Sequence, residues 1–330
     1  MTMRPLLAIV VTAWLGGGAS LAAAQSDGSQ PNVKNGEYLF YAGGCASCHA
    51  APATDRCDGS RSKDALQLVG GRCLKTDFGT FYVPNITPDK ETGIGNWSTD
   101  DFIKAMTKGV SPKGSNLYPV FPYASYQRMT RADLIDMKAF LDTLPAIASN
   151  VPEHELSFPY NIRATLSVWK ALYLDGKTFT PDPAKSAQIN RGAYLVQGPG
   201  HCGECHTPRD SLGGMIAKKK LAGAPDPEGK GMIPNLTPHE SGLGKWSEKD
   251  IAYALETGFT PSGDSMGGTM AKVQANMAKL TPLDREAIAA FLKSLPPVAS
   301  AKVEAAKTDA PKVEDIKVQT PATEGSTSPN

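Results

Sequence analysis

The feature that most constrains this chain is an internal repeat. Residues 35–52, NGEYLFYAGGCASCHAAP, are matched by residues 190–208, NRGAYLVQGPGHCGECHTP. A second match joins PNITPDKETGIGNWSTDDF, which starts at Pro84, to PNLTPHESGLGKWSEKDI, which starts at Pro234. Two copies of one unit predict two domains of the same fold rather than one larger domain.

Both copies carry the same helix signals. A serine followed three residues later by an aspartate predicts a capped helix start, and a glycine about three turns on predicts its end. A closing helix with one apolar stripe then completes each copy, over residues 130–145 and 281–296. No run alternates with period two for long enough to predict a sheet, so we expect an all-α fold. The capped helices are marked by Ser98, Asp101 and Gly109 in the first copy and by Ser247, Asp250 and Gly258 in the second.

The repeat also divides the chain. We expect domains at residues 32–147 and 188–297, joined by a connector at 148–187. The connector is rich in Pro and aromatic residues, and its apolar residues at helical spacing predict a short amphipathic helix packed on the domains, so we expect it to be ordered. These residues are Leu166, Trp169, Leu172 and Tyr173.

The two ends of the chain are not expected to belong to either domain. Residues 1–24 combine Arg4, an apolar run and three alanines, the order of parts in a cleaved secretory signal peptide. An uncleaved membrane anchor is the alternative, but three glycines from Gly16 interrupt the run before the ~20 apolar residues of a span. Residues 298–330 lack aromatic residues and predict a disordered tail. We therefore expect a periplasmic protein with no transmembrane segment in the mature chain.

Charge excludes one class of partner. Lys plus Arg number 34 and Asp plus Glu number 33, and no basic cluster is interleaved with aromatic residues. Nucleic-acid binding is therefore not expected.

Each copy contains the pattern Cys-x-x-Cys-His, which is typical of c-type haem attachment. On one helical turn two thiols reach the two vinyl groups of a porphyrin, and the next histidine can bind the iron. A zinc site that includes Cys57 and Cys73, a redox dithiol, and disulfides within each pair are alternatives, but none explains the repeated histidine. We therefore expect two covalently bound haem c groups. The predicted attachment residues are Cys45, Cys48, Cys202 and Cys205, and the predicted iron ligands are His49 and His206.

The second axial ligand can be sought by counting through the repeat. Seven residues past the end of GFTPSG the second copy has Met270, which we favour as the ligand over Met266 and Met277. Seven residues past GVSPKG the first copy has Phe121. The methionine nearest to it is Met129, directly before the cap of the closing helix, where an apolar residue usually serves as a packing staple. Met129 thus remains an alternative ligand, beside an open iron position, a cysteine, a tyrosine or water.

Two cysteines, Cys57 and Cys73, occur only in the first copy, within a stretch longer than its counterpart. We predict a disulfide between them in this insertion, with a thiolate ligand to the first iron as the alternative.

Several segments together resemble a known family. GEYL before CASCH, PNITPDKETGIGNWS, LYPVFPYASY, PYNIRA, NRGAYLV before HCGECHTPRD, and GDSMGGTM are similar to the cytochrome c subunits of bacterial periplasmic dehydrogenases for alcohols and gluconate. The resemblance covers residues 35 to 297. It implies two tandem class I cytochrome c domains that take electrons from a dehydrogenase catalytic subunit and pass them to a quinone, a cytochrome or an oxidase of the respiratory chain.

This chain departs from that family in two ways. Members often carry three haems, and many read YPAMPY where this chain reads YPVFPY, so the ligand at Phe121 is not carried over. We therefore expect a dihaem electron carrier with no catalytic residues of its own. The alternative is a dihaem enzyme, such as a thiosulfate dehydrogenase or a peroxidase-like protein, that uses an open position on the first haem.

Overall fold

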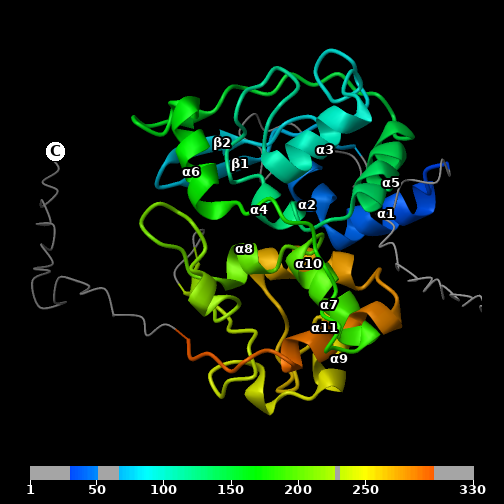
Figure 1. The fold of residues 1–330 in the computed structure, drawn as a ribbon, viewed down its shortest axis with the longest axis vertical. Coiled ribbons are helices and arrows are strands. Elements are labelled where there is room, and N and C mark those ends of the chain that lie inside the picture. Colours follow the sequence, from blue (N-terminus) through cyan, green and yellow to red (C-terminus); the bar gives the residue numbers. More distant parts are fainter. Residues whose placement is uncertain (1–29, 51–66, 227–230, 301–330) are drawn as a thin grey trace, which may run out of the picture.

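The computed structural model describes residues 30–50, 67–226 and 231–300. These residues form two mainly helical halves that lie one above the other, with the connector running along one side (Figure 1). The all-α prediction is confirmed, with small strands added to it. The predicted signal peptide at 1–24, residues 301–330 of the predicted tail and Cys57 lie outside the described residues.

The first half runs from α1 to α5 and the second from α7 to α11. The first contains α1 (Val33–Ala42), α2 (Cys45–His49), β1 (Cys73–Thr76), β2 (Gly79–Tyr82), α3 (Thr99–Lys108), α4 (Tyr123–Tyr126) and α5 (Arg131–Asp142). The second contains α7 (Ala187–Gln197), α8 (Gly203–His206), β4 (Ala224–Pro225), β5 (Met232–Ile233), α9 (Glu248–Thr257), α10 (Gly268–Met277) and α11 (Pro282–Lys293). Between them lie β3 (Glu155–Leu156) and α6 (Leu166–Tyr173).

The predicted capped helices are confirmed, whereas the closing helices α5 and α11 end at Asp142 and Lys293, before the predicted ends at 145 and 296. The caps Ser98 and Ser247 each form a reciprocal hydrogen-bonded box with the aspartate three residues later. Gly109 and Gly258 end these helices with φ of 57° and 81°, a left-handed conformation that favours glycine. Threonine side chains cap α5 and α11 by accepting from the N–H of the aspartate three residues later, without the reciprocal bond. The local signals therefore fix the same helices in both halves.

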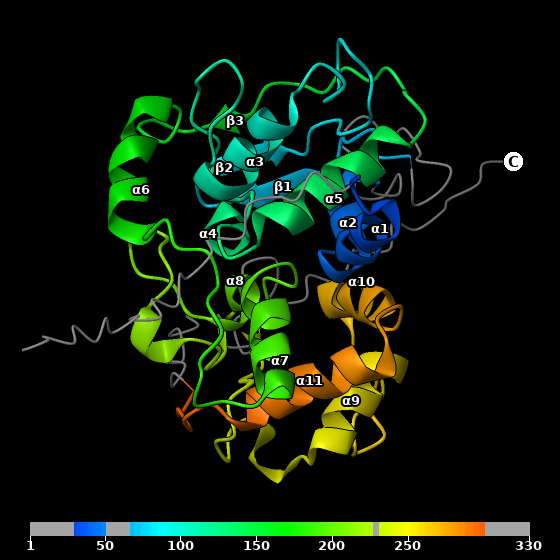
Figure 2. The same cartoon turned by 45° about the vertical axis from the view of Figure 1, so that its right-hand side comes forward.

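Each half is built on one close helix crossing, α1 on α5 and α7 on α11 (Figure 2). A glycine lies at each crossing. A Cβ atom added to Gly36 would stand 2.0 Å from the carbonyl oxygen of Asp136, and one added to Gly192 would stand 1.8 Å from that of Ala287. The backbones touch, so only glycine fits at either position. Leu39, Leu134 and Phe140 pack around the first crossing, and Leu195, Ile288 and Phe291 pack around the second.

A small sheet was not predicted from the sequence. The strands β1 and β2 pair antiparallel, with Leu74 opposite Phe81, and β3 of the connector adds to the free edge of β2. Four-residue strands are too short to show an alternating pattern, which is why the sequence gives no signal for them. The sheet ties the connector to the first half.

The connector helix α6 forms as predicted, although not every residue of its expected face is buried. Leu166 is buried, and the Trp169 ring lies edge-on to Tyr123 of the first half while its Nε1 donates to Leu212 O of the second at 3.1 Å. Leu172 is 60% exposed, so its predicted packing is wrong. The helix therefore contacts both halves through its aromatic residues. No helix within the described ranges is long and apolar enough to cross a membrane.

Candidate haem-binding sites

The two Cys-x-x-Cys-His motifs form two short helices, α2 and α8, each directly after the long first helix of its half. Cys45 and Cys202 are thiols rather than disulfide partners, as are the second cysteines of both motifs. Burial, with a further contribution from the neighbouring cysteine, raises the pKa of both to about 12. A first cysteine with a raised pKa differs from the low-pKa thiolate of a redox dithiol, which argues against that alternative.

The histidine of each motif is oriented by one backbone carbonyl. His49 Nδ1 lies 2.8 Å from Pro84 O, and His206 Nδ1 lies 2.7 Å from Pro234 O. A carbonyl oxygen only accepts, so Nδ1 carries the proton and Nε2 keeps its lone pair. A hydrogen bond that fixes the tautomer in this way is typical of histidines that bind a metal.

Burial also keeps these histidines neutral. It lowers the pKa of His49 to about 4, outweighing the opposing hydrogen bond to Pro84, and it lowers the pKa of His206 for the same reason. A neutral imidazole with a free Nε2 is the form that binds iron.

The proline carbonyls are functional groups that the sequence did not reveal. Each belongs to the repeated PN-x-T segment, in which Asn85 Oδ1 accepts from the N–H of Thr87 and Asn235 Oδ1 accepts from the N–H of Thr237. The two asparagine amides also donate to the backbone beyond the closing helices, at 2.8 and 2.7 Å. The repeat had marked these residues as equivalent. The repeat could not show that these asparagines fix the backbone next to Pro84 and Pro234, whose carbonyl oxygens orient the histidines.

These residues fit haem c at both sites. Each site has two cysteines that form no disulfide on one helical turn, a histidine with Nε2 available, and an apolar wall, since Cys45 and Cys202 pack against the core clusters of their respective halves. A polar or charged surrounding would instead suit a hydrated metal ion. No group of three or more His, Cys, Asp or Glu side chains in the described ranges is placed to hold a metal ion.

The structure aligns the two loops that carry the predicted second iron ligands. The N–H of Leu117 donates to Gly109 O at 2.8 Å, and the N–H of Met266 donates to Gly258 O at 2.8 Å. Counted from these equivalent bonds, Phe121 occupies the position of Met270. Met270 and Met266 are both half-buried, and Phe121 packs against the first core cluster.

The alternative ligand Met129 takes the place of a core leucine. Met129 is 1% exposed and its N–H donates to Tyr126 O; Leu280 is 3% exposed and its N–H donates to Met277 O. Both residues directly precede the threonine cap of a closing helix. Met129 therefore serves as the predicted packing staple, and Met277 is likewise buried in the second core.

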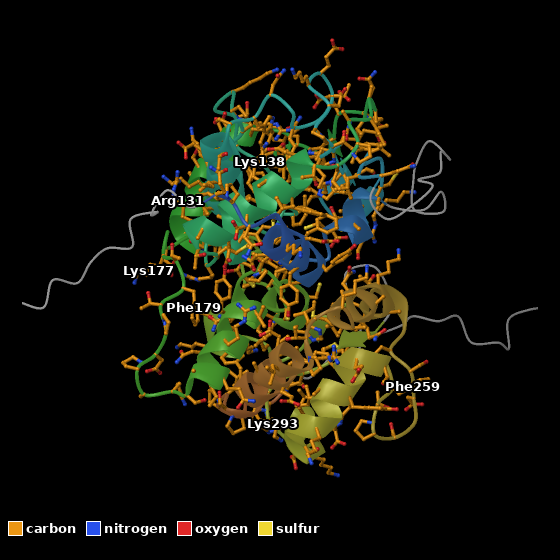
Figure 3. All side chains as sticks on the ribbon, turned by 90° about the vertical axis from the view of Figure 1, so that its right-hand side faces the viewer. Arg131, Lys138, Lys177, Phe179, Phe259 and Lys293 are labelled. Carbon is orange, nitrogen blue, oxygen red and sulfur yellow. The ribbon has the colours of Figure 1, made fainter. Side chains whose placement is uncertain are left out.

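The two loops are covered differently. In the first half, Lys170 of α6 donates to Gly109 O at 2.5 Å and to Asn116 Oδ1 at 2.8 Å, so the connector covers the loop before Phe121. In the second half, Phe259 is 50% exposed on the outer surface (Figure 3), and an added Cβ at Gly267 would meet nothing within 4 Å. The second loop is thus the more accessible of the two.

The predicted disulfide falls partly outside the described residues. Cys73, at the start of β1, is disulfide-bonded, whereas its predicted partner Cys57 is not described. The pairing itself stays a prediction.

Comparison with known proteins identifies the same two units. The cytochrome c family matches residues 33–145 and 189–296. The chain is 46% identical over 303 residues to a "Diheme cytochrome c-type" protein of Cereibacter sphaeroides, a match that covers 89% of this chain and 99% of that protein. It is 36% identical to the fructose dehydrogenase cytochrome subunit of Gluconobacter japonicus, covering 84% of this chain and 55% of that subunit. It is 35% identical to the gluconate 2-dehydrogenase cytochrome c subunit of Pantoea cypripedii, a match that covers 89% of this chain and 65% of that subunit. This chain spans nearly the whole Cereibacter protein but less than two thirds of the length of these two dehydrogenase subunits. With two matched regions that coincide with the two helical halves, the chain belongs to the cytochrome c family.

Proposed function

We propose that this protein is a periplasmic dihaem cytochrome c that carries single electrons from a dehydrogenase to the respiratory chain. The observation that carries the proposal is the pair of equivalent sites, each with two thiols and a histidine whose Nδ1 is held by a proline carbonyl. Haem bound at such a site supplies one-electron transfer between ferrous and ferric iron.

The surrounding residues prepare the sites for that chemistry. Pro84 and Pro234 fix the tautomer of His49 and His206, so each presents Nε2 without a competing proton. Burial lowers the pKa of both imidazoles and so favours their neutral form. The apolar clusters exclude water, and in cytochromes such burial helps set the reduction potential.

The proposed donor is the catalytic subunit of a periplasmic dehydrogenase. Relatives of this chain are named as cytochrome subunits of fructose, gluconate and alcohol dehydrogenases. The proposed acceptor is a quinone, a cytochrome or an oxidase. Export through residues 1–24 would bring the chain to the compartment in which such enzymes work.

Haem counting tests the central proposal. The exported protein should contain two haems per chain that resist extraction with acidified acetone, because thioether bonds hold them. The double variant Cys45→Ser, Cys48→Ser should contain one haem per chain, and the double variant Cys202→Ser, Cys205→Ser should also contain one. Extractable haem, or an unchanged count in either double variant, would refute the attachment sites. Co-purification from the native periplasm should then recover a dehydrogenase subunit, and the reduced partner should reduce the haems.

One observation favours a second function. Because Phe121 stands where the second half has Met270, the first iron has no methionine at this position, and an open iron position could serve a dihaem enzyme. Carbon monoxide added to the fully reduced protein distinguishes the two functions. Two low-spin irons that do not react exclude the enzyme, whereas one reactive iron supports it.

A further inference from the structure

The two halves meet across a pseudo-two-fold interface in which each contributes the same tyrosine. Tyr38 on α1 donates to Asp284 Oδ2 at 2.5 Å and accepts from the N–H of the threonine that caps α11. Tyr194 on α7 donates to Asp133 and accepts from the N–H of the threonine that caps α5. Phe179 of the connector, labelled in Figure 3, packs its ring against Tyr194, with ring centroids 5.6 Å apart. Each tyrosine of the repeated motif thus docks on the closing helix of the other half.

The haem-attachment helices are tied across the same interface. Ser47 lies between the cysteines of the first motif, and its Oγ accepts from Asn276 Nδ2 of α10 at 3.0 Å. Glu204 lies between the cysteines of the second motif, and its Oε1 accepts from Ser125 Oγ of α4 at 2.6 Å. Reciprocal contacts of this kind are the signature of a two-fold interface. They bring both attachment segments to the boundary between the halves.

One contact breaks this symmetry. His201, directly before Cys202, has its Nε2 3.1 Å from the backbone oxygen of Gly43, two residues before Cys45. Since a carbonyl oxygen only accepts, Nε2 is the donor. The imidazole ring also lies edge-on to Tyr126, with ring centroids 5.6 Å apart. This histidine therefore joins the two attachment segments directly.

His201 occupies a backbone position that favours glycine. Gly44 precedes the first motif with φ of 57°, and His201 precedes the second with φ of 38°. Leu221 is the other non-glycine residue with positive φ in the described ranges. A side chain at positive φ costs conformational energy, so glycine would be more stable than histidine at this position. The presence of an imidazole here therefore suggests a role other than folding.

We propose that His201 is the bridging residue through which electrons pass between the two haem sites. The route runs along the backbone from Cys45 to Gly43, across one hydrogen bond to the His201 ring, and on to Cys202. Tunnelling weakens less along covalent and hydrogen bonds than across a gap, so this contact gives a short continuous path. One iron goes from ferrous to ferric, the other goes from ferric to ferrous, and no proton or bond moves.

The proposal rests on the proposed dihaem function, and the test separates the two. The full-length holoprotein receives one electron per molecule from a photoreductant, and equilibration between the haems is followed by their absorption. His201→Gly should slow equilibration several-fold while haem content, both reduction potentials and the small-angle scattering radius stay unchanged. Glycine suits the positive φ, so the variant should fold. His239→Ala is the matched control, because the His239 imidazole bonds Ser241 of the same half, two residues along the chain, and its rate should equal that of the wild type.

A second variant tests the interface itself. Tyr38→Phe with Tyr194→Phe removes the two hydroxyls that donate to Asp284 and Asp133 and accept from the threonine caps, and it should slow equilibration while increasing the scattering radius. Tyr173→Phe, which removes a tyrosine–aspartate bond to Asp210 outside this interface, should change neither. An unchanged rate in His201→Gly with both haems bound would overturn the bridge and leave the proposed function standing. Failure of the wild type to bind two redox-active haems would overturn both.

Discussion

Replacing Gly192 by alanine should destabilise the second half, although helix propensity alone favours the opposite result. In a helix interior the change gains roughly 1 kcal/mol of propensity. Here the new Cβ would stand 1.8 Å from the carbonyl oxygen of Ala287 on α11, where contacts below 3.0 Å force a shift. Both groups are held by helix backbone, so α7 and α11 must move apart by at least 1.2 Å.

Overpacking of this kind typically costs ~1–3 kcal/mol, occasionally more. Because two backbones must move rather than one flexible side chain, we expect the upper end of that range. After the gain in propensity is subtracted, the free energy of unfolding should fall by about 2 kcal/mol. Haem attachment at α8 should also decrease, since α7 leads directly into that motif.

Urea denaturation of the purified holoprotein, followed by circular dichroism, measures the change, and haem content is read from the same samples. Gly36→Ala, whose Cβ would stand 2.0 Å from Asp136 O, should behave alike in the first half. Gly231→Ala, with nothing within 4 Å of its Cβ, is the control and should stay within ~1 kcal/mol of wild type. Equal or greater stability in Gly192→Ala would show that the close crossing is not a constraint.

Three further predictions concern single residues. Met270→Leu should abolish the red-region charge-transfer band of a methionine–iron bond while Met266→Leu retains it; the reverse result would reassign the ligand. Phe121→Met should create such a band at the first haem and decrease carbon monoxide binding there, and an unaltered spectrum would contradict the structural equivalence. Burial lowers the pKa of His154, and the positive charge of Arg163 adds to the effect. The imidazole of His154 is therefore protonated at a lower pH in the folded protein than in the unfolded chain. The free energy of unfolding should therefore fall as the pH drops below the ordinary histidine pKa of about 6.5. His154→Gln should make this fall smaller, as measured by urea titrations at several pH values. An equal pH dependence in the variant and the wild type would exclude His154 as the cause.

The helices were predictable because their signals are local. The cap at Ser98 and the terminating glycine Gly109 act within a few residues of the helix they bound, and the repeat supplied an independent copy of each signal. The short strands β1 to β3 were not predictable, because strands of two to four residues show no alternating pattern and β3 joins β2 from the distant connector.

Counting residues through the repeat also gave an alignment of the two loops that agrees with the structure. It placed Phe121 opposite Met270, and the equivalent backbone hydrogen bonds of Leu117 and Met266 support that alignment. It left Met129 open as a ligand. Only packing showed that this methionine fills the core position of Leu280.

By itself, the sequence determined that there are two units, that each carries a Cys-x-x-Cys-His motif, and where the main helices begin and end, since all of these depend on neighbouring residues. The tertiary structure decided which groups meet: Pro84 O with His49, 35 positions away, and Gly43 O with His201, 158 positions away. Such contacts depend on how folded helices pack against one another. No local pattern encodes them, so both the tautomer of His49 and His206, the predicted iron ligands, and the contact of His201 between the halves became visible only in three dimensions.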